Sequence, residues 1–260
     1  MAKELSALEQ LKASRNPLRV IEDIYKEANE GIPLKDEYIG LLKWYGMYPH
    51  VNSDGREDKK YFMKRIKLVD TKMNLAQLKV MAKIGLEYAQ GLVDFTTRQN
   101  VQFHYIQIKD MPAIFDLLQS VGLTSRMASG DGPRPIMTCP VSGVDEGEIY
   151  DVRELVKQVD TYFDKNDDRF CNFPRKYKIG ISGCKCHCAA HEIQDVAFTA
   201  FKADNSEVLF DLTIGGGLSK SKQIATRASR YVKPEQVLDV AVACAEIFRD
   251  NGNRDNRNKA

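Results

Sequence analysis

The segment Phe173–Lys178 places three cations directly before an apolar, β-prone run. Because a strand alternates its faces, Lys176 and Lys178 point to one side. Arg175 and Tyr177 point to the other. Two lysines on one strand face repel each other, so such a pair is tolerated at a solvated surface or is needed where an anion lies between them. The segment therefore indicates either a solvated edge strand or an anion site.

Composition narrows the class of protein. The chain has 260 residues and 43% hydrophobic content, enough for one or two domains with a core. A net charge of +2 provides no basic field for nucleic acid. The apolar runs are too short to span a bilayer and the N-terminus lacks a signal core, so we expect a cytoplasmic protein. Six cysteines fit that compartment as metal ligands or buried thiols rather than disulfides.

Hydrophobic spacing divides the chain into three parts and predicts an α+β fold. Residues 1–55 form a predicted helical arm, punctuated by Pro17 and Pro33 and closed by a polar loop. Residues 56–130 predict a ferredoxin-like βαββαβ unit. Its expected elements are strands at 61–69, 92–96, 101–107 and 124–128 and helices at 74–89, capped by Asn74, and 111–121.

Residues 131–260 predict a second α/β layer. The expected strands lie at 176–182, 196–201 and 207–214, and the expected helices at 149–163, 220–231 and 234–250. The polar tail 250–259 is typical of a frayed terminus.

Three further segments give the cationic strand a context. They are T-T-R-Q-N at 96–100, the rigid turn G-D-G-P-R-P at 130–135, and I-G-G-G-L-S at 214–219, where a strand runs into a glycine turn. In this order and at these separations, the segments resemble the N-terminal half of the sirohaem-dependent, ferredoxin-type sulfite and nitrite reductases. The resemblance covers about residue 61 to the C-terminus. It implies a ferredoxin-like half-domain followed by an α/β sirohaem-binding domain.

The resemblance also implies an activity. It is the six-electron reduction of sulfite to sulfide, or of nitrite to ammonia, with sirohaem and a 4Fe–4S cluster as cofactors and a ferredoxin-like electron donor. In plant-type nitrite reductases the position of Lys178 holds asparagine, so the lysine favours sulfite. Two alternatives from other classes stay open. One is a non-catalytic half that needs a partner chain carrying the missing half; the other is a zinc or redox-sensing module. A homodimer is an option for a half-chain that holds a cluster by itself.

Four cations match the family's residues over the distal face of sirohaem, namely Arg98, Arg134, Lys176 and Lys178. Arginine suits oxyanions because its fork is planar and always charged, and lysine adds a compact charge with an exchangeable proton. The alternatives are that Arg98 caps a hairpin turn and that Arg134 is an exposed loop cation.

A further set of residues matches positions along the macrocycle edge. These candidate cofactor-binding residues are Thr97, Gln99, Asn100, Gln102, Gly215, Gly216 and Gly217. Glycine allows a backbone to approach a ligand closely, although an ordinary tight turn also needs it. The polar side chains alternatively pair across a hairpin.

The cysteines match the family's cluster motif incompletely. That motif supplies four thiolates as C-x5-C and C-x3-C. Cys139, Cys184 and Cys188 match three ligands, and the remaining position is Asp145. Either these cysteines are an echo of the family's internal duplication and ligate nothing, or Asp145 or another cysteine completes the set. The alternatives for the fourth thiolate are Cys171 and Cys186. Zinc is a further alternative, although C-x-C-x-C differs from ordinary zinc spacing.

Overall fold

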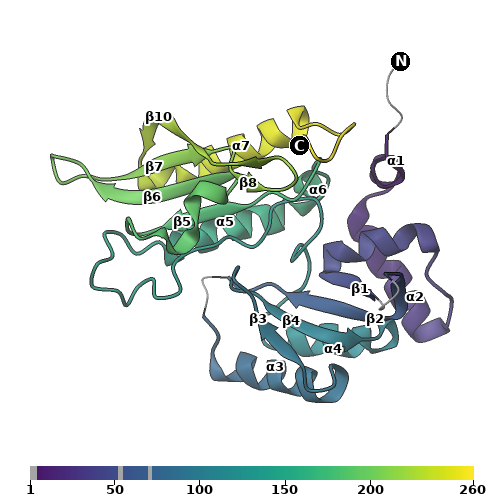
Figure 1. The fold of residues 1–260 in the computed structure, drawn as a ribbon. Helices are drawn as coiled ribbons and strands as arrows, with labels where there is room; N and C mark the ends of the chain where they lie inside the picture. Colours follow the sequence, from purple (N-terminus) through teal and green to yellow (C-terminus); the bar gives the residue numbers. More distant parts are fainter. Residues whose placement is uncertain (1–4, 52–54, 70–71) are drawn as a thin grey trace. The chain divides into compact units, whose positions relative to one another are not determined.

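The computed structural model describes residues 5–51, 55–69 and 72–260, which divide into two compact units (Figure 1). The N-terminal unit comprises 7–68 and 72–130, and the C-terminal unit consists mainly of 131–260. Each unit contains a four-stranded sheet. None of the helices in these ranges is long and apolar enough to cross a membrane.

The sheet of the N-terminal unit is antiparallel, with strand order β1-β2-β4-β3. Its strands are β1 (Met47–Val51), β2 (Glu57–Ile66), β3 (Val93–Phe95) and β4 (Val101–Ile106). Helices α3 (Leu75–Tyr88) and α4 (Met111–Gln119) contact each other on one face of it (Figure 1). Helices α1 (Ala7–Ser14) and α2 (Val20–Glu30) precede the sheet, together with the 3-10 helices η1 (Pro17–Arg19) and η2 (Asp36–Tyr45). A third 3-10 helix, η3 (Ile108–Asp110), lies between β4 and α4.

Helix α3 shows how local sequence sets an element. The Asn74 side chain accepts a hydrogen bond from the Gln77 amide at 2.9 Å, and the Gln77 side chain accepts one from the Asn74 amide at 3.0 Å. This capping box satisfies amides that the first turn leaves unpaired, and it confirms the predicted cap. Further along, a Cβ on Gly85 would lie 2.6 Å from Val93, so the glycine allows the helix to approach the sheet.

Strand β1 was not predicted, and the strand predicted at 124–128 was wrong. In that last stretch the structure has a single bridge between Thr124 and Lys67. The outer edge of β2 pairs with β1 instead, with a register shift after Pro49. Proline is tolerated in an edge strand and at an irregularity, and this pairing depends on tertiary contact rather than on the local pattern.

Strand β2 carries a fully buried lysine. The Lys64 ammonium donates to the Tyr45 carbonyl at 2.7 Å and to the Ser125 hydroxyl at 2.6 Å. It also lies 4.6 Å from the centre of the Phe115 ring. Burial removes water from the charged form, and it lowers the pKa of Lys64 well below the usual lysine value.

We expect the free energy of unfolding to rise with pH more steeply in the wild-type chain than in a Lys64→Met variant. Because the folded-state pKa of Lys64 lies below the unfolded value, the unfolded chain binds the extra proton between the two values, and stability increases with pH there. The slope approaches about 1.4 kcal/mol per pH unit and ends near pH 10.4, roughly the ordinary lysine pKa. Urea titrations followed by Trp44 fluorescence measure it. The exposed Lys79→Met serves as control, and equal slopes in wild type and Lys64→Met would contradict the expectation.

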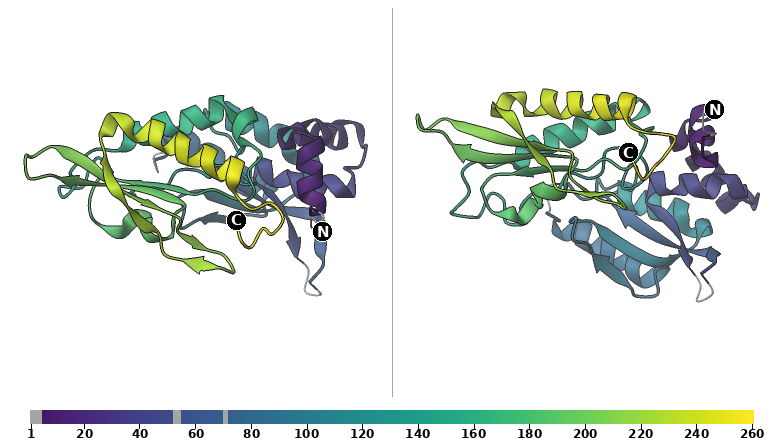
Figure 2. Two further views of the ribbon diagram at one scale, coloured as in Figure 1. Left: turned by 90° about the horizontal axis from the view of Figure 1, so that it is seen from above. Right: turned by 45° about the horizontal axis from the view of Figure 1, so that its top comes forward.

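The C-terminal unit has strand order β10-β7-β6-β5, with β5 parallel to β6 and the other pairs antiparallel. Its strands are β5 (Ile179–Ser182), β6 (Val196–Lys202), β7 (Val208–Ile214) and β10 (Thr226–Val232), and β8 (Gly217–Leu218) pairs with β9 (Lys222–Gln223). Helices α5 (Arg153–Lys165) and α7 (Val237–Asn251) cover one face of the sheet (Figure 2) and share its core. Short elements are α6 (Asp167–Phe170), η4 (His187–Ala189), η5 (His191–Ile193) and η6 (Pro234–Gln236).

The prediction of a helix at 220–231 was wrong, because strands β9 and β10 lie in this stretch. Strand β10 pairs with β7, joining Thr226 to Ile214 and Val232 to Phe210. Most of its side chains are exposed and Val232 is buried. A largely polar edge strand carries no clear alternation of apolar residues, so the partner strand rather than the sequence pattern selects its conformation.

Candidate anion and cofactor site

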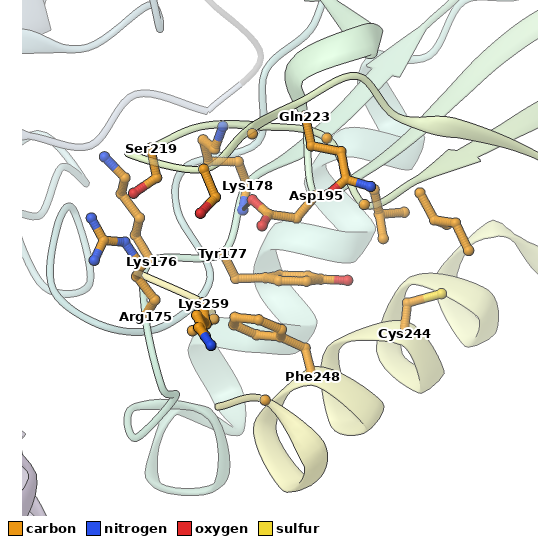
Figure 3. Close-up of a pocket in the computed structure, with 18 of the residues that line it drawn as sticks. Arg175, Lys176, Tyr177, Lys178, Asp195, Ser219, Gln223, Cys244, Phe248 and Lys259 are labelled. Atoms are coloured by element: carbon orange, nitrogen blue, oxygen red, sulfur yellow. Dashed lines mark hydrogen bonds between the residues drawn. The ribbon is translucent and has the colours of Figure 1, made fainter. Parts of the chain in front are cut away.

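A cavity of about 530 Å³ opens in the C-terminal unit (Figure 3). Its lining combines cations, a glycine turn and an apolar wall. The lining includes Arg175, Lys176, Tyr177, Lys178, Asp195, Gly215, Gly216, Gly217, Cys244, Ile247, Phe248 and Lys259. A cavity whose lining has four cationic side chains and one acidic side chain favours anions.

The turn that carries Arg134 is joined to the cationic segment by backbone hydrogen bonds. The Arg134 amide donates to the Tyr177 carbonyl at 2.7 Å, and the Tyr177 amide donates to the Gly132 carbonyl at 3.0 Å. Pro133 forms a parallel bridge with Tyr177. The structure therefore brings the backbone of Arg134 beside that of Lys176 and Lys178.

The two lysines flank a buried aromatic ring. The Tyr177 side chain is buried in the core, whereas Lys176 is exposed and Lys178 is half-buried. The Lys178 ammonium donates to the Ile193 carbonyl at 2.6 Å, and the Lys178 amide donates to Asp195 at 2.8 Å. Lys178 is therefore fixed by its neighbours, and Lys176 is exposed at the rim of the cavity.

The apolar wall of the cavity consists of an aromatic stack and a thiol. The rings of Tyr177 and Phe248 are stacked with centroids 5.3 Å apart (Figure 3). The Tyr177 hydroxyl has no hydrogen-bond partner among the described residues, and burial raises its pKa well above the usual value. Burial also raises the pKa of the Cys244 thiol, so both groups stay neutral near pH 7.

The three glycines of the turn differ in backbone conformation and in the space beside their Cα atoms. Gly215 has a φ of +82°, a left-handed conformation that favours glycine. A Cβ on Gly216 would lie 2.6 Å from the carbonyl oxygens of both Glu192 and Gln194, whereas a Cβ on Gly217 would meet no atom within 4 Å. Gly216 thus allows the chain to pack against itself, and Gly217 leaves open space beside the cavity.

Arg98 lies in the N-terminal unit, in the turn between β3 and β4. The Asn100 side chain donates to the Arg98 carbonyl at 2.9 Å, and the Asn100 amide donates to the Thr96 hydroxyl at 3.1 Å. Gln99 has a φ of +59°. Asn100 therefore stabilises the turn that presents Arg98.

The other polar candidates of this hairpin differ in their surroundings. The side-chain Oε1 of Gln102 accepts hydrogen bonds from the Arg65 guanidinium at 2.7 and 3.2 Å. Arg65 lies on β2, so this contact joins Gln102 to the other neighbouring strand and not across the β3–β4 hairpin. Thr97 is exposed, and Gln99 is half-buried.

The candidate thiol ligands lie next to one another. Cys139 and Cys184 are buried, whereas Cys186 and Cys188 are exposed. Burial raises the pKa of Cys139, as does the adjacent Cys188 thiol, and the Cys184 thiol raises the pKa of Cys186. Within residues 5–51, 55–69 and 72–260, no three His, Cys, Asp or Glu side chains form a group able to hold a metal ion. Three of the family's four ligand positions nevertheless hold neighbouring thiols, and the fourth holds Asp145.

The other candidates for the fourth ligand make local hydrogen bonds. The Asp145 carboxylate accepts from the Gly147 amide at 2.9 Å, and the Cys171 thiol lies 3.6 Å from the Asp168 carbonyl oxygen. Each contact satisfies a group of its own turn.

Three contributors to the cavity were missed by sequence reasoning. Asp195, Phe248 and Lys259 lie 17 to 81 positions beyond Lys178, so no local motif connects them to it. For Lys259, the sequence held one signal that its tail is docked and not frayed. Two arginines, Arg254 and Arg257, precede it in a segment otherwise rich in asparagine.

Comparison with known proteins identifies the class. Residues 129–260 match the family described as "Nitrite and sulphite reductase 4Fe-4S domain", and residues 54–121 match "Nitrite/Sulfite reductase ferredoxin-like half domain". The chain belongs to the nitrite and sulfite reductase family, whose members are oxidoreductases. The predicted family and the predicted α+β fold are confirmed.

Particular relatives include both kinds of reductase. The chain is 35% identical over 274 residues to "Sulfite reductase [ferredoxin]" of Mycobacterium tuberculosis, covering 98% of this chain and 48% of the relative. It is 33% identical over 257 residues to "Assimilatory ferredoxin-dependent nitrite reductase" of Haloferax mediterranei, covering 92% and 43%. The structure of the Mycobacterium tuberculosis NirA protein is similar with a TM-score of 0.91 and 33% identity, over 99% of this chain and 49% of that one. The chain thus spans about half the length of these relatives.

Family membership implies sirohaem and a 4Fe–4S cluster as cofactors. The cavity of the C-terminal unit fits the edge of a carboxylate-bearing tetrapyrrole, because cations lie beside an apolar wall and Gly217 leaves space. The neighbouring thiols of Cys139, Cys184 and Cys188 have the ligand chemistry of a 4Fe–4S cluster, and Asp145 stands at the fourth position.

Proposed function

We propose that this chain forms the anion-binding half of a sirohaem-dependent reductase that converts sulfite to sulfide. One observation carries the proposal: backbone hydrogen bonds join the Arg134 turn to the segment of Lys176 and Lys178 beside a cavity lined with cations. Nitrite reduction is the second candidate, supported by relatives named nitrite reductases. The cytoplasmic location stays a prediction.

The proposed roles follow from the surroundings of each cation. Lys176 is exposed at the cavity, so its ammonium binds an oxyanion and delivers a proton from Nζ to an oxygen as the bond to that oxygen breaks. Solvent then restores the proton. Arg134 and Lys178 add positive charges that already lie in place before the anion binds. Lys178 is held there by its hydrogen bonds to Ile193 and Asp195. Arg98 is proposed as a fourth cation that acts on the same anion.

Sirohaem, when bound, supplies the redox chemistry that side chains lack. In the proposal, Gly215, Gly216 and Gly217 shape the backbone at the macrocycle edge, and Phe248 provides apolar contact. The hairpin residues Thr97, Gln99, Asn100 and Gln102 are proposed to form or support a second edge.

The proposal includes two partners. A ferredoxin-like donor supplies electrons, in keeping with the names of the relatives. A second half-chain, or a second copy of this chain, completes the cluster site, for which Cys139, Cys184 and Cys188 stay candidate ligands. The contrasting candidate is a half-chain that binds neither cofactor nor anion without its partner.

Absorption spectroscopy with iron and sulfide analysis tests the proposal. The chain is purified anaerobically from a host that makes sirohaem. Sirohaem bands with about four irons beyond the haem iron would show that the chain builds both cofactor sites. Sirohaem bands alone would support the cavity and assign the cluster to the partner. A colourless, iron-free chain that also fails to bind sulfite by calorimetry would reject the proposal for this chain.

A further inference from the structure

The segment after α7 folds back onto the C-terminal unit. The Arg257 guanidinium donates to both carboxylate oxygens of Asp131, each at 2.8 Å, and to the Pro174 carbonyl at 3.2 Å. In return, Arg175 donates to the Arg257 carbonyl at 2.8 Å. The Asp131 side chain is only 4% exposed and that of Arg257 is 27% exposed, so the carboxylate of this fork-to-carboxylate pair is shielded from water.

A second arginine anchors the same segment. Arg254 donates to the side chain of Asn172 at 3.0 Å and to its carbonyl at 2.9 Å. At the start of the segment, a Cβ on Gly252 would lie 2.7 Å from the Pro174 ring. The tail predicted to be frayed is therefore docked along residues 172–175.

These contacts reach both cationic segments of the candidate site. Asp131 lies in the turn that carries Arg134, and Pro174 precedes Arg175 and Lys176. One guanidinium thus connects the two segments. The residues that follow Arg257 line the cavity, where Lys259 adds a positive charge (Figure 3).

We propose that Arg257 is a positioning residue of the anion site. Its planar fork holds the Arg134 turn and the Lys176 segment in one geometry, and it holds the following residues as a wall of the cavity. This inference deepens the proposed function and rests on it. A lysine lacks the rigid fork that grips a carboxylate and a carbonyl together, so geometry rather than charge is the property at issue.

The test compares Arg257→Gln and Arg257→Lys with the wild-type chain. Sulfite binding is measured by isothermal titration calorimetry at low ionic strength, and amide hydrogen exchange is followed in residues 131–136 and 172–178. We expect sulfite affinity to fall about tenfold in both variants, the lower end of what a supporting contact contributes. Exchange in both segments should rise. Asp131→Asn provides a second route to the same loss if an Arg257 variant folds poorly.

The matched control is Arg227→Gln, which removes one charge and one Arg–Asp contact, at 2.6 Å, from β10 outside the cavity. Wild-type affinity is expected there. Full affinity in Arg257→Lys, or an equal loss in Arg227→Gln, would show that charge alone matters and would overturn the proposal. If the wild-type chain binds no sulfite, the proposed function fails, and the exchange data still decide whether Arg257 holds the two segments.

Discussion

Replacing Gly216 by alanine is expected to destabilise the C-terminal unit by about 2–3 kcal/mol, the cost of forcing a methyl group into a closed space. The new Cβ would lie 2.6 Å from two carbonyl oxygens and 3.0 Å from the Ile193 Cα. All three are backbone atoms, so no side-chain rotation relieves the contact. The free energy of unfolding from urea titration, followed by circular dichroism, measures the loss.

Gly217→Ala is the matched control, because its Cβ would meet no atom within 4 Å. We expect stability to change by less than about 0.5 kcal/mol, as for an ordinary surface substitution. The same variant should lower sirohaem content, since the methyl group enters the space beside the cavity. Equal destabilisation by the two substitutions would contradict the distinction between the two glycines.

Replacing Lys176 by methionine is expected to reduce turnover of the holoenzyme about a hundredfold, the effect of removing one preorganised charge from a developing anion. Stability should not change, because the Lys176 side chain is exposed. Turnover is measured as sulfide produced with an artificial electron donor. Calorimetry of sulfite binding to the isolated wild-type and variant chains shows how much of the lost turnover comes from weaker binding of sulfite.

The control for Lys176 is Lys202→Met, which removes an exposed lysine from the end of β6 outside the cavity. Unchanged turnover is expected there. Lys178→Met should lower both turnover and stability, because the Lys178 ammonium holds the Ile193 carbonyl at 2.6 Å. Wild-type turnover in a fully loaded Lys176→Met enzyme would reject the role of Lys176.

Elements with a strong local pattern were predictable. Helix α3 begins at the predicted cap because Asn74 and Gln77 are close in sequence and satisfy each other's amides. Strands β6 and β7 lie within a residue of their predicted ranges, since they are apolar and central. Edge strands β1 and β10 were missed because their conformation depends on pairing with a neighbour.

The sequence by itself determined the family, the α+β class and the candidate cations. Short motifs such as F-P-R-K-Y-K can be read from the order of the residues, without knowledge of the fold. Only the tertiary structure decided how they are held. Arg257 and Asp131 are 126 positions apart, and no local pattern predicts that they pair. Likewise, Gly216 and Gly217 are neighbours in one glycine run, and only the carbonyls packed against Gly216 distinguish them. Contacts between distant segments are products of folding, so the sequence names the groups and the fold assigns their partners.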